Sequence, residues 1–305
     1  MSETIEVTGD CATWIRARPA AYVELVKPRI AVMVIVVTGL GFCLALPRGA
    51  DLAVLPLLLH TLLGTGLVGA GSNVLNQYFE AELDGRMVRT LNRPLPSGRL
   101  SSGEALAFGL SLSVLGVGYL CAMVNPLCGA LGAGGILLYT FVYTPLKRWT
   151  PLSVFVGAIP GALPPVIGWC AVTGSVSAPA ILLFAILFFW QLPHFASISW
   201  LYRGDYARAG FPMMPVVDPG GRRTSLHLIT QTVALVMASL LPMFHGLAGP
   251  TYAVGAMVLG AAFLAFGGLF VCRKTAATAR LHVLASVVYL PLLLTLMMLD
   301  RVPAS

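Results

Sequence analysis

Nine long apolar stretches occupy most of this 305-residue sequence, and they limit its possible folds more than any other feature. A helix needs about 20 predominantly apolar residues to cross the hydrocarbon core of a bilayer. Hydrophobic residues make up 57% of the chain and charged residues only 10%, which excludes an ordinary water-soluble domain. The stretches lie at about 30–47, 52–79, 102–121, 126–145, 151–171, 178–201, 226–246, 251–271 and 281–299.

Only helices and closed barrels satisfy the backbone polar groups of a segment that crosses lipid. The apolar stretches lack the short alternating pattern of barrel strands. The sequence therefore predicts an all-α polytopic membrane protein, a bundle of about nine transmembrane helices. We expect a cytoplasmic N-terminal segment (1–29), a single transmembrane domain (30–299) and a short C-terminal tail (300–305).

The basic residues are distributed unevenly between the two predicted sides of the membrane. Cytoplasmic loops collect Lys and Arg, and with a cytoplasmic N-terminus every basic residue except Arg48 and Arg301 lies inside. Residues 1–29 contain several acids and no apolar core, unlike a cleavable signal or transit peptide. We expect a bacterial inner membrane and a periplasmic C-terminus. The net charge of +7 is spread over short loops, so the expected surrounding is the lipid bilayer and no nucleic acid.

The longest polar segments, about 80–101 and 202–225, are the expected catalytic loops, and both fall on the predicted cytoplasmic side. A stripe of oxygen-bearing side chains leads into the first. At about 100° per residue, Asn76, Glu80 and Asp84 share one helix face, whereas Glu82 points away. Such a set suits Mg²⁺, which takes one or two carboxylates together with substrate phosphate oxygens. A solvated helix end is the simpler alternative, but ionisable groups at a membrane helix end are candidates for function.

Basic side chains follow or flank this stripe in three segments. Guanidinium groups match phosphate oxygens in a bidentate manner, which favours a phosphate-bearing ligand. The cytoplasmic orientation by itself is an alternative explanation for the pair at the end of the fourth span. The three groups are Arg86, Arg89 and Arg93 after the stripe, Arg203 and Arg208 around Asp205 in the second loop, and Lys147 and Arg148 after Tyr143 in the fourth span.

With these residues in view, the chain resembles the UbiA-type intramembrane prenyltransferase superfamily. The Asn76, Glu80, Asp84 pattern is similar to its first acidic motif, and the run from Tyr143 to Arg148 to its tyrosine and lysine-arginine element. Within the superfamily the match is closer to the heme O synthases, or protoheme IX farnesyltransferases. This narrower resemblance covers about residues 22–299 and is carried by Lys27 to Arg29, Asn76 to Leu95, Trp190 to Phe195 and Asp205 to Pro215.

The resemblance implies transfer of a farnesyl group from farnesyl diphosphate to a vinyl group of heme b, with water addition, to give heme O and diphosphate. It implies Mg²⁺ held by Asn76, Glu80 and Asp84. The second acidic motif departs from that of the superfamily because Asp205 is its one acid, available to a second ion. The residues implied for the diphosphate are Lys27, Arg29, Arg86, Arg89, Arg93, Tyr143, Lys147, Arg148, Arg203 and Arg208.

His194 and Trp190 are the expected heme contacts. His194 is the histidine that lies within a span toward the catalytic face, and Trp190, one turn earlier, could stack on a porphyrin. Ordinary packing is the simpler interpretation of both side chains. A downstream heme-modifying protein or a cytochrome oxidase assembly protein is a further expected partner.

Two other functions stay open. A prenyltransferase of the same fold could act on a quinone precursor or on another tetrapyrrole. A secondary transporter would also have many spans, but transporters place their sites near the midplane on broken helices. The acids of this chain lie at helix ends on one side, which favours the transferase.

Overall fold

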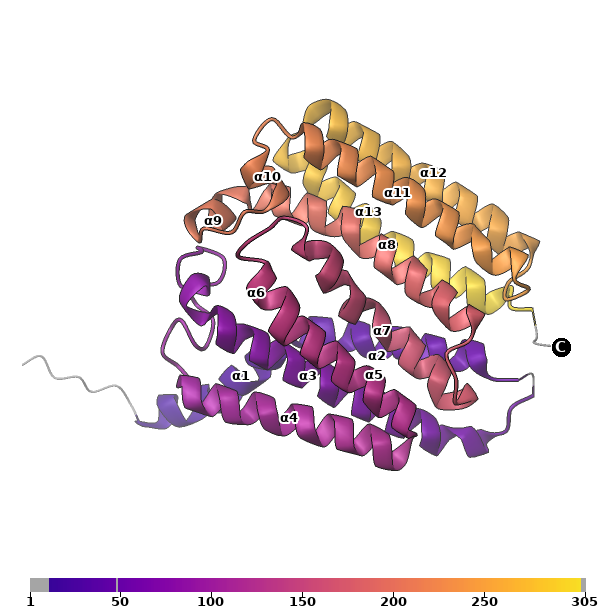
Figure 1. Cartoon of the computed structure of the whole chain (residues 1–305), viewed down its shortest axis with the longest axis horizontal. Helices are drawn as coiled ribbons and strands as arrows, with labels where there is room; N and C mark the ends of the chain where they lie inside the picture. Colours follow the sequence, from indigo (N-terminus) through magenta and orange to yellow (C-terminus); the bar gives the residue numbers. More distant parts are fainter. Residues whose placement is uncertain (1–10, 48, 303–305) are drawn as a thin grey trace, which may run out of the picture.

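The computed structural model describes residues 11–47 and 49–302, and most of these are helical (Figure 1). Nine helices in this described part are long and apolar enough to cross a membrane, which confirms the predicted all-α bundle. They are α2 (Pro28–Ala45), α3 (Leu55–Asp84), α4 (Ser102–Met123), the continuous α5, η2 and α6 (Pro126–Leu137, Leu138–Tyr143 and Thr144–Leu146), α7 (Ser153–Thr173), α8 (Ala178–Leu201), α11 (Arg222–Phe244), α12 (Pro250–Arg273) and α13 (Ala276–Leu299).

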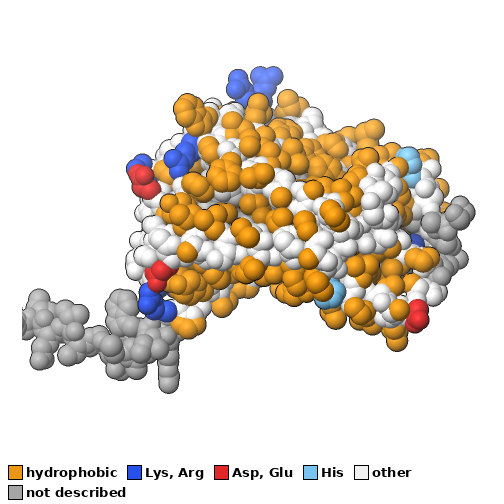
Figure 2. Space-filling model, turned by 60° about the horizontal axis from the view of Figure 1, so that its bottom comes forward, with side chains coloured by type: hydrophobic (Ala, Val, Ile, Leu, Met, Phe, Trp, Pro, Cys, Tyr) orange, Lys and Arg blue, Asp and Glu red, His pale blue; other side chains and the backbone are white. Residues whose placement is uncertain are grey.

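The outer surface of the bundle is apolar, as a chain surrounded by lipid requires. Figure 2 shows hydrophobic side chains over most of one face, with basic and acidic side chains near its margins. Large side chains such as Leu59, Val114 and Phe244 are exposed on this surface. An apolar surface of this extent favours hydrocarbon as its surroundings, because exposing it to water costs free energy.

The helices form two connected groups. In the first, α3 packs along α4, α4 along α5, and α7 against both α2 and α5. In the second, α11, α12 and α13 pack in sequence, and α8 contacts both α11 and α13. Contacts between α7 and α8 join the groups. The C-terminal end of α3, the start of α2 and the short helices α9 (Arg203–Arg208) and α10 (Met214–Val217) lie at one end of the bundle (Figure 1).

Helices α2 and α7 approach closely because each presents a glycine to the backbone of the other. A side chain at Gly168 would meet the carbonyl oxygen of Thr38, and one at Gly41 would meet that of Pro165. Small residues permit this backbone contact in membranes, where van der Waals packing drives helix association. The contact fixes α7 beside α2, and both helices supply walls of the site described below.

Replacing Gly168 by alanine is therefore expected to destabilise the protein, by about 1–3 kcal/mol, because the new methyl group forces two backbones apart. Gly118 in α4 is the matched control, since the space beside it is open. Thermal unfolding in detergent should show a lower midpoint for Gly168→Ala than for the wild type, and an unchanged midpoint for Gly118→Ala. Equal midpoints for the two variants would contradict the assigned contact.

An additional helix, α1 (Cys11–Val26), precedes the first span and was not indicated by the sequence. Its residues Ala21 and Leu25 are buried. Two amides of α3 hold its C-terminal carbonyl groups: Gln77 Nε2 donates to the oxygen of Leu25 at 2.6 Å, and Asn73 Nδ2 to that of Val26 at 3.3 Å. The end of α1 is thus anchored beside the acidic stripe.

Candidate active site

The acidic stripe lies on one face of the last turns of α3, as the sequence predicts. Asn76, Glu80 and Asp84 are 4%, 3% and 1% exposed, so all three point into the bundle. Glu82 is exposed instead and pairs with Arg86 one turn later, which confirms that it faces away. Two carboxylates in such a buried position require compensating charge.

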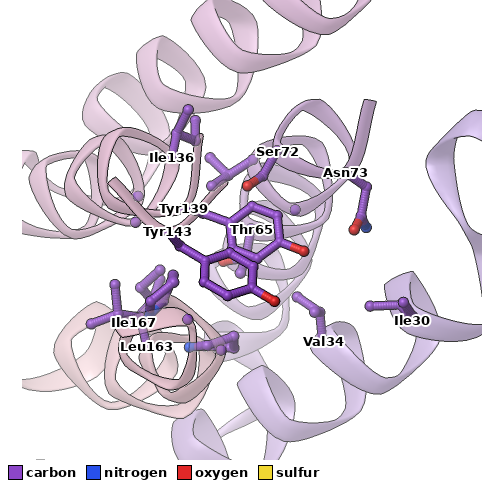
Figure 3. A pocket seen from close by; sticks show the side chains of 18 of the residues that line it. Ile30, Val34, Thr65, Ser72, Asn73, Ile136, Tyr139, Tyr143, Leu163 and Ile167 are labelled. Carbon is purple, nitrogen blue, oxygen red and sulfur yellow. The ribbon is translucent and has the colours of Figure 1, made fainter. Parts of the chain in front are cut away.

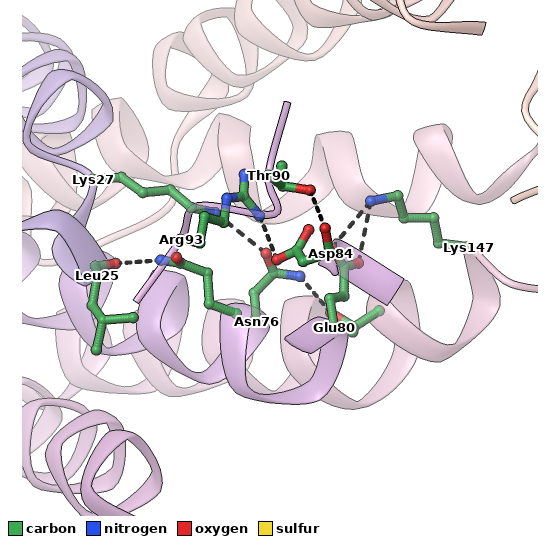
Figure 4. A network of polar contacts seen from close by, with 10 residues as sticks. Leu25, Lys27, Asn76, Glu80, Asp84, Thr90, Arg93 and Lys147 are labelled. Atoms are coloured by element: carbon green, nitrogen blue, oxygen red, sulfur yellow. Dashed lines mark hydrogen bonds and ion pairs between the residues drawn. The ribbon is translucent and has the colours of Figure 1, made fainter. Parts of the chain in front are cut away.

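Three basic side chains from three other segments supply that charge (Figure 4). Because each partner comes from a different part of the chain, the cluster exists only in the folded protein. The contacts are Lys27 Nζ to Asn76 Oδ1 (3.3 Å), Lys147 Nζ to both carboxylate oxygens of Glu80 (3.2 Å each) and Arg93 Nη1 to Asp84 Oδ2 (2.6 Å).

Lys27 reaches the stripe through an uncommon backbone conformation. It links α1 to α2 with a φ of 56°, in the left-handed region that few non-glycine residues adopt. Pro28 follows as the first residue of α2, where its missing N–H is not needed. Strained residues of this kind persist where the surrounding fold determines them, often at functional sites.

One oxygen of the stripe has no hydrogen-bond donor in the part of the chain that the structure describes. This atom is Asp84 Oδ1, which is buried, whereas Oδ2 of the same carboxylate accepts from Arg93. The Thr90 hydroxyl donates to the backbone oxygen of Asp84 at 2.7 Å and so closes the loop over this residue. A buried carboxylate oxygen without a donor costs free energy, and a cation is its natural partner.

The donor set fits a hard divalent ion that is shared with a phosphate ligand. No group of three or more His, Cys, Asp or Glu side chains suited to a metal occurs in the described part of the chain. That excludes a complete protein cage among those residues but not a Mg²⁺ site, because Mg²⁺ uses few carboxylates and keeps water or phosphate oxygens. Glu80, Asp84 with its unpartnered oxygen, and the Asn76 carbonyl are ligands of the required type.

The two lysines of the cluster differ in their affinity for protons. Burial, with Arg93 nearby, lowers the pKa of Lys27 to about 8, and the acids of the stripe offset this only in part. Burial also disfavours charged Lys147, but the Glu80 carboxylate outweighs it and holds the pKa of Lys147 above its usual value. Lys147 therefore holds its proton more firmly than an ordinary lysine, whereas Lys27 loses its proton more readily.

The second predicted loop lies against the first. Asp205 in α9 is 8% exposed and pairs with Arg208, and its Oδ2 accepts from the backbone N–H of Arg89 at 3.4 Å. The Arg89 guanidinium lies over the Tyr202 ring, 4.8 Å from its centroid. Lys147 lies 4.5 Å from the ring centroid of Phe211. The fold thus joins three segments that are far apart in the sequence.

Three other predicted phosphate-binding residues lie away from the stripe. Arg148 donates to the backbone oxygen of Phe79 at 2.8 Å. Arg203 lies over the Trp200 ring and donates to the oxygen of that residue at 3.0 Å. Arg29 is exposed at the start of α2. These three side chains are not brought into the central cluster, which consists of Lys27, Lys147 and Arg93 around the stripe.

An apolar cavity of about 270 Å³ opens beneath this cluster. Its walls come from α2, α3, α5, η2, α7 and α8, and it reaches the polar end through Asn73 and Tyr143. The rings of Tyr139 and Tyr143 project into it and stack with centroids 5.1 Å apart (Figure 3). The labelled lining side chains of Figure 3 are Ile30, Val34, Thr65, Ser72, Asn73, Ile136, Tyr139, Tyr143, Leu163 and Ile167.

A local π-helical turn connects the two tyrosines to the acidic stripe. Pro145 lacks the N–H that an α-helix would need at this position. The six residues Leu138–Tyr143, which end two positions before it, widen into the π-turn η2. The Thr144 hydroxyl donates to the oxygen of Tyr139 at 2.9 Å and accepts from Asn76 Nδ2 at 3.2 Å. Tyr139 is not among the residues predicted from the sequence, although its spacing of four residues from Tyr143 indicates a shared helix face.

His194 and Trp190 lie on the α13 side of α8. Trp190 Nε1 donates to the backbone oxygen of Ser286 at 2.7 Å, and His194 Nδ1 lies 2.6 Å from the hydroxyl oxygen of the same serine. The two rings stack with centroids 5.1 Å apart. The cavity is lined by Gln191 and Phe195 of α8 instead. Contact of His194 and Trp190 with heme stays a prediction, and both side chains face α13 and not the cavity.

The arrangement suits a molecule with a polyanionic head and a long apolar tail. The cationic cluster and a divalent ion would receive the head, and the cavity would receive the tail. Because lysine, arginine and metal charges favour an anionic leaving group, the site can assist heterolytic cleavage of a bond to phosphate. The cavity limits access of bulk water to the cation that such cleavage leaves.

Comparisons with known proteins agree with this chemistry. The profile of the UbiA prenyltransferase family matches residues 32–297. A protoheme IX farnesyltransferase of Solibacter usitatus (strain Ellin6076) is 48% identical over 286 residues, which cover 92% of this chain and 98% of that protein. A solved structure described as digeranylgeranylglyceryl phosphate synthase in membranes has a TM-score of 0.76 at 19% identity, and covers 93% of this chain and 98% of its own. A UbiA homolog from Archaeoglobus fulgidus bound to GPP and Mg²⁺ has a TM-score of 0.62 at 16% identity, over 91% of this chain and 99% of that one.

Proposed function

Because the chain belongs to the UbiA prenyltransferase family, we propose that it transfers the farnesyl group of farnesyl diphosphate to a vinyl group of heme b. Water adds in the same reaction, and the products are heme O and diphosphate. The observation that carries the proposal is the buried stripe of α3, held by three cations at the mouth of an apolar cavity. The identity of 48% to a protoheme IX farnesyltransferase over nearly the whole chain supports the choice of substrates.

Mg²⁺ is the proposed cofactor, with Asn76, Glu80 and Asp84 as its protein ligands and Asp205 available to a second ion. The solved structure of a UbiA homolog bound to GPP and Mg²⁺ supports this choice. When bound, the ion neutralises charge on the diphosphate and makes it a better leaving group. The unpartnered Asp84 Oδ1 is the protein atom most in need of such an ion.

The basic residues of the cluster would exchange partners when the substrate binds. Without substrate, Lys27, Lys147 and Arg93 neutralise the stripe. If the stripe held a metal ion, these cations would be free to turn to the diphosphate oxygens. There they would stabilise the charge that develops as the C1–O bond breaks. Arg89 of the first loop and Arg208 of the second, which both contact Asp205, would bind the same head group.

The cavity would hold the farnesyl chain and the reacting carbons. The tyrosine rings of η2 line the wall directly below the cluster, where the allylic cation forms. Aromatic faces stabilise cations electrostatically. The vinyl group of heme b then supplies its π electrons to C1 of the farnesyl group, and water captures the resulting cation beside the porphyrin ring.

Heme b must approach from the side of the cavity that leaves its vinyl group near the tyrosines. We propose that α8 guides it, with His194 and Trp190, on the side of this helix that faces α13, as its contacts. The cluster would face the cytoplasm of a bacterial cell, with the chain in the inner membrane. A downstream heme-modifying protein or an oxidase assembly protein is the proposed recipient of the product.

Competition between acceptors tests the proposed function. The purified protein is incubated with farnesyl diphosphate, Mg²⁺, heme b and an aromatic quinone precursor, and the products are identified by mass spectrometry. The expected product is farnesylated heme that has gained one water molecule. Prenylation of the quinone precursor alone would overturn the choice of acceptor, and the absence of any prenylated product would overturn the transferase assignment.

The kcat/KM for farnesyl diphosphate is expected to fall as the pH rises through about 8. This parameter reports groups of the free enzyme, and burial lowers the pKa of free Lys27 to about 8. Above that pH the ammonium group is lost, so kcat/KM should fall about tenfold between about pH 7 and about pH 9. Lys27→Arg keeps its charge, and its profile should stay flat over this range. An equal decline in both proteins would assign the titration to another group.

A further inference from the structure

Gln191 is a polar side chain in the wall of the cavity. Binding of farnesyl diphosphate and of the metal does not require its amide group. It lies in the middle of α8 and is 7% exposed. Its Oε1 atom lies against Gly161, one helical turn along α7 from Gly157, which packs against the Tyr143 ring. Gln191 therefore lies about one turn from Tyr143 in the same cavity, in the region proposed for the reacting carbons.

The hydrogen bonds of Gln191 determine which end of its amide faces the cavity. The Nε2 group donates to the backbone oxygens of Ala158 at 3.2 Å and Leu187 at 3.0 Å. Only an NH₂ group can satisfy two carbonyl acceptors, and both of its hydrogens are then used. The Oε1 atom points at Gly161, where any side chain would collide with it, and it accepts no hydrogen bond from residues 11–47 or 49–302. An unpartnered acceptor is thus held in the cavity wall.

Helix α7 adds two more acceptors at the same place. Pro164 and Pro165 lie inside α7 and lack the N–H groups that would bond to the carbonyls of Pro160 and Gly161. Both of these residues line the cavity, as Gln191 does. Carbonyls that proline frees in a membrane helix are paired again by neighbouring groups or by ordered water. The wall between α7 and α8 therefore offers backbone acceptors that lack their usual helical donors.

We propose that Gln191 positions the water molecule that adds to the farnesylated heme cation, an inference that rests on the proposed function. Among the reactants, the ionised diphosphate, the propionates and the alkenes offer no strong hydrogen-bond donor, whereas water offers two. A water that donates its hydrogens to Gln191 Oε1 and a freed α7 carbonyl directs a lone pair into the cavity. That orientation suits a nucleophile.

The bond changes of this step balance without any further reagent. The C1–O bond of farnesyl diphosphate breaks, and its electron pair leaves on the diphosphate. The vinyl π pair forms the new carbon–carbon bond and leaves a cation on the vinyl carbon next to the porphyrin. The lone pair of the positioned water forms the carbon–oxygen bond, and the released proton passes to a diphosphate oxygen. Gln191 is a positioning residue here, because its amide accepts no proton.

The partition between two products tests this role. Without a positioned water, the cation loses a proton and gives a farnesylated alkene that is lighter by one water molecule. Gln191→Met preserves the length and approximate volume of the side chain but removes the amide. We expect the alkene to become the major product, whereas total heme alkylation should fall much less than the yield of hydrated product. Gln231→Met, on α11 outside the cavity, is the matched control and should form the hydrated product as the wild type does.

A second variant leaves Gln191 intact. Pro165→Ala restores an N–H donor for the Gly161 carbonyl, so it should also raise the alkene fraction, to a smaller extent. The inference fails if Gln191→Met keeps the wild-type ratio of hydrated product to alkene. It also fails if Gln191→Met forms neither product, because the water step follows alkylation. Wild-type protein that does not farnesylate heme would instead overturn the proposed function together with this inference.

Discussion

Substituting asparagine for Asp84 is expected to reduce kcat/KM for farnesyl diphosphate by roughly a hundred- to a thousandfold, the loss typical when a group that stabilises transition-state charge is removed. The amide has nearly the shape of the carboxylate, so the variant should still fold. It loses the charge that a divalent ion requires, and Arg93 loses its 2.6 Å partner. Steady-state kinetics over a range of Mg²⁺ concentrations should show a much higher Mg²⁺ requirement.

Glu82→Gln is the control for this prediction, because Glu82 lies two residues away on the same helix but is exposed and faces outward. Its activity should stay within about twofold of the wild type, as expected for a surface ion pair of small energy. If the two variants lost activity equally, a general effect of negative charge at this end of α3 would explain the result, and the metal assignment would be wrong.

Lys147→Met is expected to lower both stability and activity. It leaves the Glu80 carboxylate buried without its cation, and such a broken pair costs about 3–5 kcal/mol. The double variant Glu80→Met/Lys147→Met removes both charges and should recover most of the lost stability, because apolar side chains replace a buried pair well. It should remain inactive, since the diphosphate and metal contacts are absent. Thermal unfolding in detergent without substrate measures the first effect, and turnover measures the second.

Arg86→Met removes one partner of the exposed Glu82 pair and is the comparison for stability. Its effect should be below about 1 kcal/mol. The interpretation of Lys147 as a buried counter-ion would be contradicted if the double variant were as unstable as the single one. Activity in the double variant would contradict the role of Glu80 and Lys147 in binding the substrate head.

Much of this site could be predicted because it depends on helix periodicity. The spacing of Asn76, Glu80 and Asp84 places them on one face of any regular helix, and the structure confirms that face. The long apolar stretches likewise predict the spans, because a bilayer imposes a minimum length. These features are local, and local geometry can be read directly from spacing.

Tertiary pairing could not be predicted in the same way. Lys27, Arg93 and Lys147 were three of ten basic or tyrosine candidates, and nothing in the sequence separates them from Arg148 or Arg203. The selection depends on a left-handed residue before α2 and on loops that fold back over α3. The orientation of Gln191 depends on carbonyls of its own helix and of α7, which are adjacent only in the folded bundle.

We propose that the buried stripe of α3 and a divalent ion together activate farnesyl diphosphate for transfer to heme b. The most direct test of this proposal is the mass of heme extracted after incubation of the purified protein with both substrates, first with Mg²⁺, then after chelation and then after Mg²⁺ is restored. Farnesylated, hydrated heme should form, cease to form and form again, and diphosphate should be released with it. Formation of the same product at the same rate in the chelated protein would contradict the account.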